Sequence, residues 1–236
     1  MIEPQLHVLD EPARAVGELL AAQATAGGAI VLTGGTSVGT AYEYAAASES
    51  NWRRVSLWWG DERCVPPGDE RSNFGLARRT LLDRLAGMPE VHRIRGELPP
   101  PAAASTYDAE LAGVVLDLLL LGLGADGHIA SLFPGSPQLR ERQARVTAGA
   151  AHLEPFVERV TMTLPTLLSA RRIVFLVTGA AKASVLERAF AGPISADLPA
   201  SLLREGNAPL EVFCDRDAGG LIDSSDHSAA AEQTSG

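Results

Sequence analysis

The sequence has few cysteines, and this shortage limits the kinds of protein it can encode. Among 236 residues only Cys64 and Cys214 are cysteines, and they lie far apart, in neither a CxxC nor a CxH arrangement. We therefore expect no disulfide scaffold and no thiolate metal site. A reducing compartment is the natural environment of such a chain.

Long apolar runs are also missing. The longest, from Val114 to Leu121, is interrupted by Asp117 and is too short to span a bilayer. The first residues carry no basic segment followed by an apolar one, so they do not resemble a secretory signal. From the sequence we expect a soluble, cytoplasmic protein.

The chain has no excess of positive charge either. Its formal net charge is −9 at pH 7. We therefore expect no nucleic-acid partner and no membrane partner, because a protein with a net negative charge does not attract either polyanion. An anionic small molecule would have to be bound by a few locally placed cations. We expect a monomer or a weak homo-oligomer.

Apolar segments with strand character alternate with segments of helical period. We expect strands at residues 29–32, 55–59, 91–94, 115–121, 160–164, 173–177 and 210–213, and helices at 11–26, 40–47, 73–85, 103–112 and 180–190. Continuous apolar strands between helices are typical of a mostly parallel sheet with helices on both faces. The sequence thus predicts a single α/β, Rossmann-like domain over residues 1–217. Residues 218–236 lack aromatics and an apolar period, and we expect them to form a flexible tail.

Ligands of an open parallel α/β sheet bind beyond the carboxyl ends of the strands. The first segment in such a place contains Gly34, Gly35 and Thr36. Glycines let the backbone approach an anion closely, and free amides at a helix N-terminus bind it. An ordinary tight turn would have the same sequence. The segment is neither a P-loop nor a dinucleotide fingerprint, because the required spacings are missing.

A charged segment follows the next predicted strand. It contains Asp61 and Arg63, an acid and a cation that can orient a substrate hydroxyl and bind a phosphate or carboxylate. A solvated charged turn is the alternative. Downstream, Ser72 and Asn73 add polar groups at a helix start, where the default interpretation is an N-cap.

A histidine lies in the glycine-rich segment after the strand at 115–121. A lone histidine is more often structural than catalytic, but His128 sits among three glycines and two residues from Asp126. An imidazole with an ordinary pKa of about 6.5 suits a general base that activates water. No cluster of His, Cys or carboxylates has ligand spacing, so we expect no metal site.

Two further cations are candidates for anion binding. Lys182 lies in the first turn of a predicted helix, where its charge opposes the helix dipole unless an anion is near. Arg159 stands just before the predicted strand at 160–164. Either residue can equally be a surface cation.

Taken together, these segments resemble the 6-phosphogluconolactonase family, which is part of the glucosamine-6-phosphate isomerase/6-phosphogluconolactonase superfamily. The matching segments stand in family order, over roughly residues 7 to 218: LTGGT at 32–36, WGDER at 59–63, SN at 72–73, GLGADGHIASLFP at 122–134, RVT at 159–161 and GAAK at 179–182. The resemblance implies a lactonase-type fold and hydrolysis of 6-phospho-D-glucono-1,5-lactone to 6-phospho-D-gluconate, a step of the pentose phosphate pathway, without a required cofactor.

The resemblance also implies roles for single residues. His128 would be the base and Asp61 an active-site carboxylate. The expected substrate contacts are Gly34, Gly35, Thr36, Arg63, Ser72, Asn73, Gly127, Arg159 and Lys182. Two positions depart from the family pattern, which usually has proline where Val38 stands and tryptophan where Phe213 stands. Neither position carries the expected chemistry.

Two other functions compete with lactone hydrolysis. Glucosamine-6-phosphate deaminases and related isomerases look like GxGxDGHIAFNEP, with a glutamate soon after the histidine. Here the next acid is Glu141, so proton transfer between two carbons would lack its carboxylate. A non-catalytic sugar-phosphate sensor usually carries a helix-turn-helix before this domain, whereas the first predicted helix here already starts at Glu11.

Overall fold

The centre of the molecule is a seven-stranded parallel sheet. The computed structural model describes residues 1–151 and 154–222. The strands follow the spatial order β1-β10-β9-β6-β2-β3-β5, and every neighbouring pair is parallel. Their bounds are β1 Gln5–Val8, β2 Gly28–Leu32, β3 Val55–Trp59, β5 Glu90–Val91, β6 Leu116–Leu121, β9 Ile173–Val177 and β10 Leu210–Cys214.

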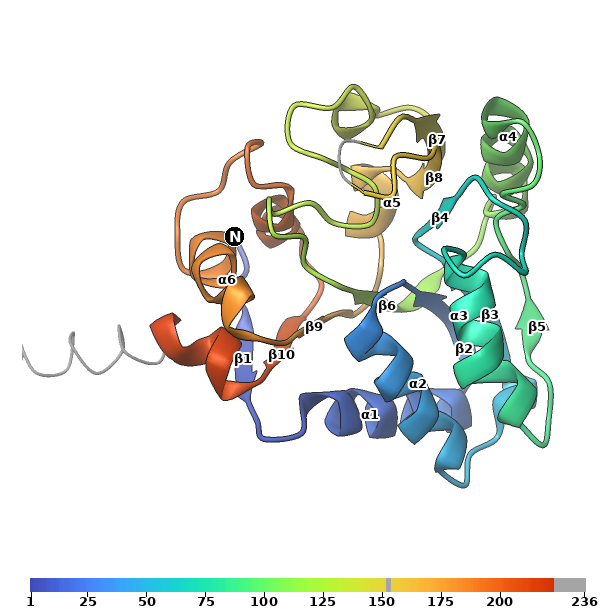
Figure 1. Cartoon of the computed structure of the whole chain (residues 1–236), viewed down its shortest axis with the longest axis horizontal. Coiled ribbons are helices and arrows are strands. Elements are labelled where there is room, and N and C mark those ends of the chain that lie inside the picture. Colours follow the sequence, from blue (N-terminus) through green and yellow to red (C-terminus); the bar gives the residue numbers. More distant parts are fainter. Residues whose placement is uncertain (152–153, 223–236) are drawn as a thin grey trace, which may run out of the picture.

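Helices cover both faces of this sheet, as the sequence predicts. Figure 1 shows α1 and α2 below the row of strands and α4 and α5 above it. The α-helices are α1 Pro12–Ala26, α2 Thr36–Ala47, α3 Asn73–Thr80, α4 Pro100–Glu110, α5 Leu164–Leu168 and α6 Ala183–Phe190. Short 3-10 turns lie at η1 Trp52–Arg54, η2 Leu82–Arg84, η3 Gln138–Arg140, η4 Ala180–Lys182 and η5 Pro199–Glu205.

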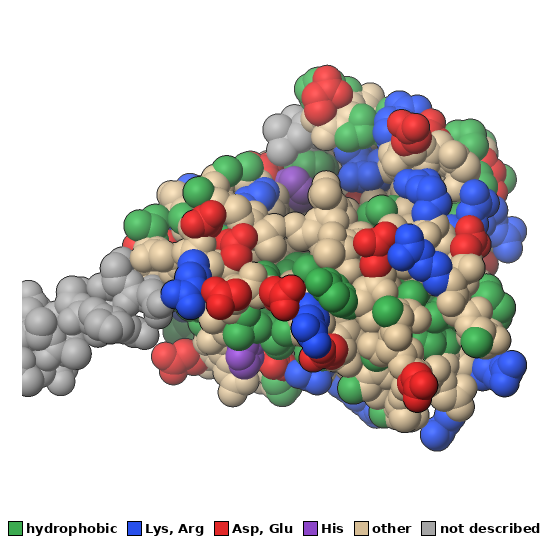
Figure 2. Space-filling view, turned by 60° about the horizontal axis from the view of Figure 1, so that its bottom comes forward, with side chains coloured by type: hydrophobic (Ala, Val, Ile, Leu, Met, Phe, Trp, Pro, Cys, Tyr) green, Lys and Arg blue, Asp and Glu red, His purple; other side chains and the backbone are tan. Residues whose placement is uncertain are grey.

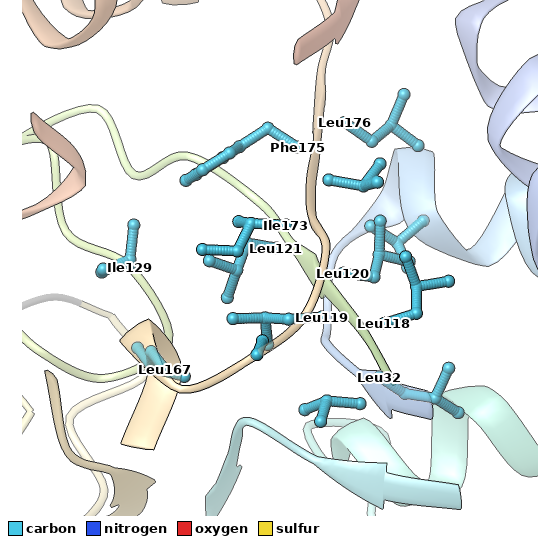
Figure 3. Close-up of a cluster of buried hydrophobic side chains, with 14 of the residues drawn as sticks. Leu32, Leu118, Leu119, Leu120, Leu121, Ile129, Leu167, Ile173, Phe175 and Leu176 are labelled. Atoms are coloured by element: carbon cyan, nitrogen blue, oxygen red, sulfur yellow. The ribbon is translucent and has the colours of Figure 1, made fainter. Parts of the chain in front are cut away.

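The strand β6 is buried on both faces, which explains its unbroken run of leucines. Leu118, Leu119, Leu120 and Leu121 are each 0% exposed. Because side chains alternate along a strand, two of them point to each side of the sheet, and Figure 3 shows this division. A polar residue at any of these positions would be buried without water, so this strand is fixed at the centre of the fold.

A second, three-stranded antiparallel sheet was not predicted. It has the order β4-β8-β7, with β4 at Asp61–Arg63, β8 at Arg159–Met162 and β7 at Val146–Gly149. The charged segment from Asp61 to Arg63 is therefore an edge strand, and not the solvated turn that was the alternative for it. The strand expected at 160–164 exists but belongs to this small sheet. Strands of three or four residues are too short to show a clear alternating pattern, so the sequence does not reveal how these three strands pair.

Several predicted boundaries are wrong. The helix expected at 40–47 begins four residues earlier, at Thr36. Its first turn, Thr-Ser-Val-Gly, has low helix propensity, so the sequence does not indicate this start. The helix expected at 73–85 ends at Thr80 and continues as the turn η2. Residues 216–222 are helical and Ala218 is 0% exposed, so the boundary predicted at residue 217 falls inside a packed helix. The rest of the expected tail, 223–236, lies outside the described residues.

The surface carries both signs of charge. On the face shown in Figure 2, described side chains of Lys, Arg, Asp and Glu are interspersed. Within residues 1–151 and 154–222, helices are either too short or too polar to cross a bilayer.

One ion pair at the edge of the main sheet gives a pH-dependent contribution to stability. Glu211 of β10 is 8% exposed, and its Oε1 accepts a hydrogen bond of 2.7 Å from Arg172 Nε. His7 Nε2 of β1 lies 3.3 Å from Oε2. Burial opposes the ionisation of Glu211, but Arg172 and His7 outweigh it, so the pKa of this carboxyl is lowered from its usual 4.5.

Replacing Glu211 by Gln tests this contribution. A lowered pKa means that the carboxylate stabilises the fold above its unfolded pKa and that this stabilisation is lost as pH falls through the folded pKa. At pH 7 we expect Glu211→Gln to lose about 1–2 kcal/mol of unfolding free energy. At pH values well below 4.5 the variant and the parent should converge. Urea unfolding at both pH values measures this, and an equal gap at both would show that charge is not involved.

Candidate active site

The candidate site lies where the order of the parallel sheet reverses. The strands β2 and β6 are neighbours, but the chain leaves β2 towards β3 and β5 and leaves β6 towards β9 and β10. At such a switch point the connections diverge and leave a crevice at the carboxyl ends of the two strands. A cavity of about 510 Å³ opens there, between Gly34–Gly35 after β2 and Gly122–Gly124 after β6.

Most of the predicted site residues line this cavity. They come from five segments that lie far apart in the sequence, at the ends of β2, β4, β6 and β9 and at the start of α3. The predicted residues on its wall are Gly34, Gly35, Thr36, Asp61, Arg63, Asn73, His128 and Lys182.

Three predicted substrate contacts do not lie on this wall, and each has a structural explanation. The hydroxyl of Ser72 accepts the amide of Gly75 and caps α3. Gly127 has φ +85° and packs against Leu198, where a Cβ would overlap the side chain. The Arg159 side chain is buried, and its Nη2 donates to the carbonyl of Pro155 at 3.0 Å.

The imidazole of His128 is held by Asp126. Its Nδ1 lies 2.5 Å from Asp126 Oδ1, which also accepts the backbone amide of His128 at 3.1 Å. Burial opposes the ionisation of Asp126, but the contacts with His128 outweigh it and lower the pKa of this carboxyl. An ionised Asp126 favours the proton on Nδ1, which leaves Nε2 with a free lone pair. The ring also lies against Phe133, with 4.6 Å between centroids.

The imidazole fits here because residue 124 is a glycine. A Cβ at Gly124 would overlap the ring of His128, and the amide of Gly124 donates to the His128 carbonyl at 3.0 Å. The segment therefore folds back on itself in a tight turn, with the ring lying directly over the backbone. The glycines that weaken regular structure in this segment are what allow the histidine to be placed.

Asp61 is a buried carboxylate with two fixed neighbours. Oδ2 accepts the hydroxyl of Ser131 at 2.6 Å, and Oδ1 accepts Asn73 Nδ2 at 3.0 Å. Asp61 is 5% exposed, yet it lines the cavity. Each carboxylate oxygen can accept two hydrogen bonds, so both keep one position for a donor on a bound ligand.

The N-terminus of α2 opens into the same cavity. Its N-cap, Gly35, has φ +126° and offers no side chain, so the first amides of the helix are not capped by it. The hydroxyls of Ser37 and Thr178 are hydrogen-bonded to each other, which joins this helix start to the end of β9. Uncapped amides at a helix N-terminus favour an anion.

Lys182 supplies positive charge on one side of the cavity, and it is the only lysine in the whole sequence. Its Nζ donates to the carbonyl of Leu123 at 2.8 Å. Burial lowers the pKa of this amine, and the nearby Asp126 opposes that shift. An anion placed beside such a partly desolvated ammonium group stabilises its charged form.

Arg63 supplies positive charge from β4. It stands directly opposite Arg159 of β8, and both residues project to the same face of the small sheet. Burial and the charge of Arg63 lower the pKa of Arg159. Within the described residues, the Nε atoms of both side chains are buried and lack a hydrogen-bond partner. Two adjacent guanidinium groups of this kind favour a bound anion.

Four residues that shape the site are not among the predicted site residues. Glu62 binds the start of α3, Ser131 and Asp126 fix the two functional side chains, and Thr178 meets Ser37. Asp126 was within reach, because it lies two residues from His128. The other contacts join positions up to 141 residues apart, and no local pattern reveals them. Among residues 1–151 and 154–222, no group of three His, Cys, Asp or Glu side chains is placed to hold a metal ion.

Comparisons with known proteins agree on one family. The family model described as glucosamine-6-phosphate isomerases/6-phosphogluconolactonase matches residues 7–212. A 6-phosphogluconolactonase of Homo sapiens is 40% identical over 187 residues, which are 75% of this chain and 72% of that protein. One of Aggregatibacter actinomycetemcomitans is 36% identical over 203 residues, 82% of this chain and 87% of that protein. The solved 6-phosphogluconolactonase of Trypanosoma brucei superposes with a TM-score of 0.82 at 26% identity, over 94% of this chain and 100% of that one.

Replacing Gly124 by Ala should displace the imidazole of His128. The added methyl group would occupy the position of the ring, so the hydrogen bond between His128 and Asp126 should break. We expect the downfield Nδ1–H signal of His128 in the proton NMR spectrum to disappear. Gly68→Ala is the matched control, because a Cβ at Gly68 meets no atom within 4 Å among the described residues. A signal that persists in Gly124→Ala would contradict this account of the turn.

Proposed function

The chain belongs to the glucosamine-6-phosphate isomerase/6-phosphogluconolactonase family, and on that premise we propose that it hydrolyses 6-phospho-D-glucono-1,5-lactone to 6-phospho-D-gluconate. Curated relatives that are 36% and 40% identical over most of this chain carry the name 6-phosphogluconolactonase. The single observation that carries the mechanism is the hydrogen bond between Asp126 and His128, whose ring lies on the wall of the cavity.

In this mechanism His128 is the general base. Asp126 holds the proton on Nδ1, and Nε2 takes a proton from a water molecule as that water attacks the lactone carbonyl carbon. A tetrahedral intermediate forms with a negative charge on the former carbonyl oxygen. The bond between C1 and the ring oxygen then breaks, and the imidazolium returns the proton to the departing oxygen. The products are a carboxylic acid, which releases its proton to solvent and becomes a carboxylate, and a free hydroxyl group; no covalent enzyme intermediate is needed.

Positive charge and polar groups hold the substrate for this attack. We assign the phosphate to the uncapped start of α2, with Arg63 and Lys182 on either side. Asp61 accepts a hydrogen bond from a sugar hydroxyl and so orients the ring relative to His128. A δ-lactone is an activated ester, and positioning plus one base supplies what its hydrolysis requires.

The isomerase alternative has less support. Carbon-to-carbon proton transfer calls for a second acid close to the histidine. Glu141, the first acid after His128, is half-buried, and its Oε1 accepts the amides of Arg142, Gln143 and Ala144. It does not line the cavity. Lactone hydrolysis needs no such group.

Replacing His128 by Asn should reduce turnover strongly. Asparagine is similar in size but cannot take the proton from water, so kcat for the phosphorylated lactone should fall by about 10²–10⁴-fold. The assay must be corrected for the spontaneous opening of the lactone. His92→Asn is the matched control, because His92 stacks on Trp58 outside the cavity. Near-parental turnover in a folded His128→Asn protein would rule out this mechanism.

Removing the charge of Arg63 or Lys182 should weaken recognition of the phosphate. A charge-assisted contact contributes roughly 1.5–3 kcal/mol, so each Ala variant should raise KM about tenfold to over a hundredfold. The same changes should affect unphosphorylated glucono-δ-lactone much less. Equal losses on both substrates would assign the two residues a structural role.

The single lysine offers a second measurement of the same contact. Lys182 Nζ and the N-terminal amine are the chain's two primary amines. Reductive methylation followed by mass spectrometry therefore reports on Lys182 against an internal control. We expect 6-phosphogluconate to slow methylation of Lys182 and to leave the N-terminal amine unaffected. Equal protection of both would argue against binding at Lys182.

A further inference from the structure

Glu62 is a buried acid to which the mechanism assigns no role. It lies between Asp61 and Arg63 on β4, and because side chains alternate along a strand it points away from the cavity that they line. It is 2% exposed. A carboxylate is costly to bury, so its partners must account for its presence.

Four donors surround this carboxylate, and three of them belong to the start of α3. Oε1 accepts the amides of Arg63 and Asn73, both at 2.7 Å. Oε2 accepts the amide of Phe74 at 2.8 Å and the hydroxyl of Ser72 at 2.9 Å. Burial raises the pKa of the Glu62 carboxyl above its usual 4.5, and these four hydrogen bonds oppose that shift without cancelling it. An ionised carboxylate accepts only, and every partner here donates, so Glu62 fixes the first turn of α3 to β4.

Asn73 connects the start of α3 to the candidate site. It is the first residue of α3, and its Nδ2 donates to the carbonyl of Asp61 at 2.9 Å and to Asp61 Oδ1 at 3.0 Å. Its side-chain amide also lies against Gly34, where a Cβ would overlap it. Asn73 therefore connects the Asp61 carboxylate with the glycine turn after β2. A shift of α3 would move both.

We propose that Glu62 is a positioning residue for substrate binding: it fixes the start of α3, and Asn73 transmits that position to the carboxylate of Asp61. The inference rests on the proposed function, in which Asp61 accepts a hydrogen bond from a sugar hydroxyl. Glu62 itself does not touch the substrate. Its effect is felt through the orientation of Asp61.

Glu62→Gln tests the proposal, because glutamine keeps the size of the side chain but turns an NH₂ group towards donors. We expect KM for the phosphorylated lactone to rise about tenfold or more, the usual effect of a lost contact to a charged group. A purely structural role gives a different result. Loss of stability alone lowers the folded fraction and with it the apparent kcat, and leaves KM unchanged. An unchanged KM overturns the proposal.

Two comparisons make the result specific. Glu211→Gln removes another buried carboxylate, at the far edge of the sheet, and should leave KM unchanged. In an Asp61→Asn background, Glu62→Gln should raise KM less than threefold, since the group it positions is already altered. If the KM increases of Asp61→Asn and Glu62→Gln multiply fully in the double variant, Glu62 does not act through Asp61.

A second variant serves if Glu62→Gln does not fold. Ser72→Ala removes one of the four donors and should raise KM by a smaller factor. An unchanged KM in Ser72→Ala overturns the proposal as well.

A measurement without substrate separates this proposal from the proposed function. The side-chain NH₂ signals of Asn73 report its hydrogen bonds to Asp61. In Glu62→Gln we expect these signals to shift and their protons to exchange faster with water. If the parent protein does not hydrolyse the lactone, the proposed function fails, but these signals still test whether Glu62 positions Asn73. Unchanged Asn73 signals would then overturn the role of Glu62.

Discussion

Gly60 joins the two sheets of the molecule, and the geometry of the site follows from that junction. Its amide donates to the carbonyl of Leu32 at the end of β2 at 2.9 Å, and its carbonyl accepts the amide of Met162 at 2.8 Å. The first bond continues the main sheet, and the second begins the small antiparallel one. The residue after Gly60 is Asp61, so this junction delivers the carboxylate directly to the carboxyl end of β2. There it faces the helix start at α2 and the glycine segment after β6.

The parts of the fold that could be predicted are those whose signal is local. β6 is a run of leucines because both faces of the strand are buried, and the segment can be read without knowing its neighbours. β4 has the opposite character. Its three residues are all charged, and they form a strand because β8 offers an antiparallel partner almost a hundred residues later. The sequence around Asp61 contains no trace of that partner, so it does not predict a strand here.

The same division separates the site residues. His128 and Asp126 are close in sequence, and glycines around them signal an unusual backbone, so the pair could be anticipated. Ser72 and Gly127 belong to the same recognisable segments, but the structure uses them to cap a helix and to shape a turn. A motif therefore indicates a segment near the cavity without telling which of its side chains line it. Glu62 shows the reverse case, a residue inside a motif whose contacts become visible only when α3 is in place.

One strained residue couples the two functional side chains. Ala130 has φ 49°, a left-handed conformation that costs a residue with a Cβ roughly 1–2 kcal/mol. It persists because hydrogen bonds fix the backbone around it: the amide of Leu132 donates to Ile129, and that of Ser131 to the hydroxyl of Thr161. The turn at Ala130 directs the hydroxyl of Ser131 towards Asp61, while the imidazole of His128, two residues earlier, is hydrogen-bonded to Asp126. Four consecutive residues thus position both the proposed base, His128, and the carboxylate of Asp61. Their relative position is determined by the backbone of this one turn, so a change that relaxes Ala130 would alter the alignment of both groups at once.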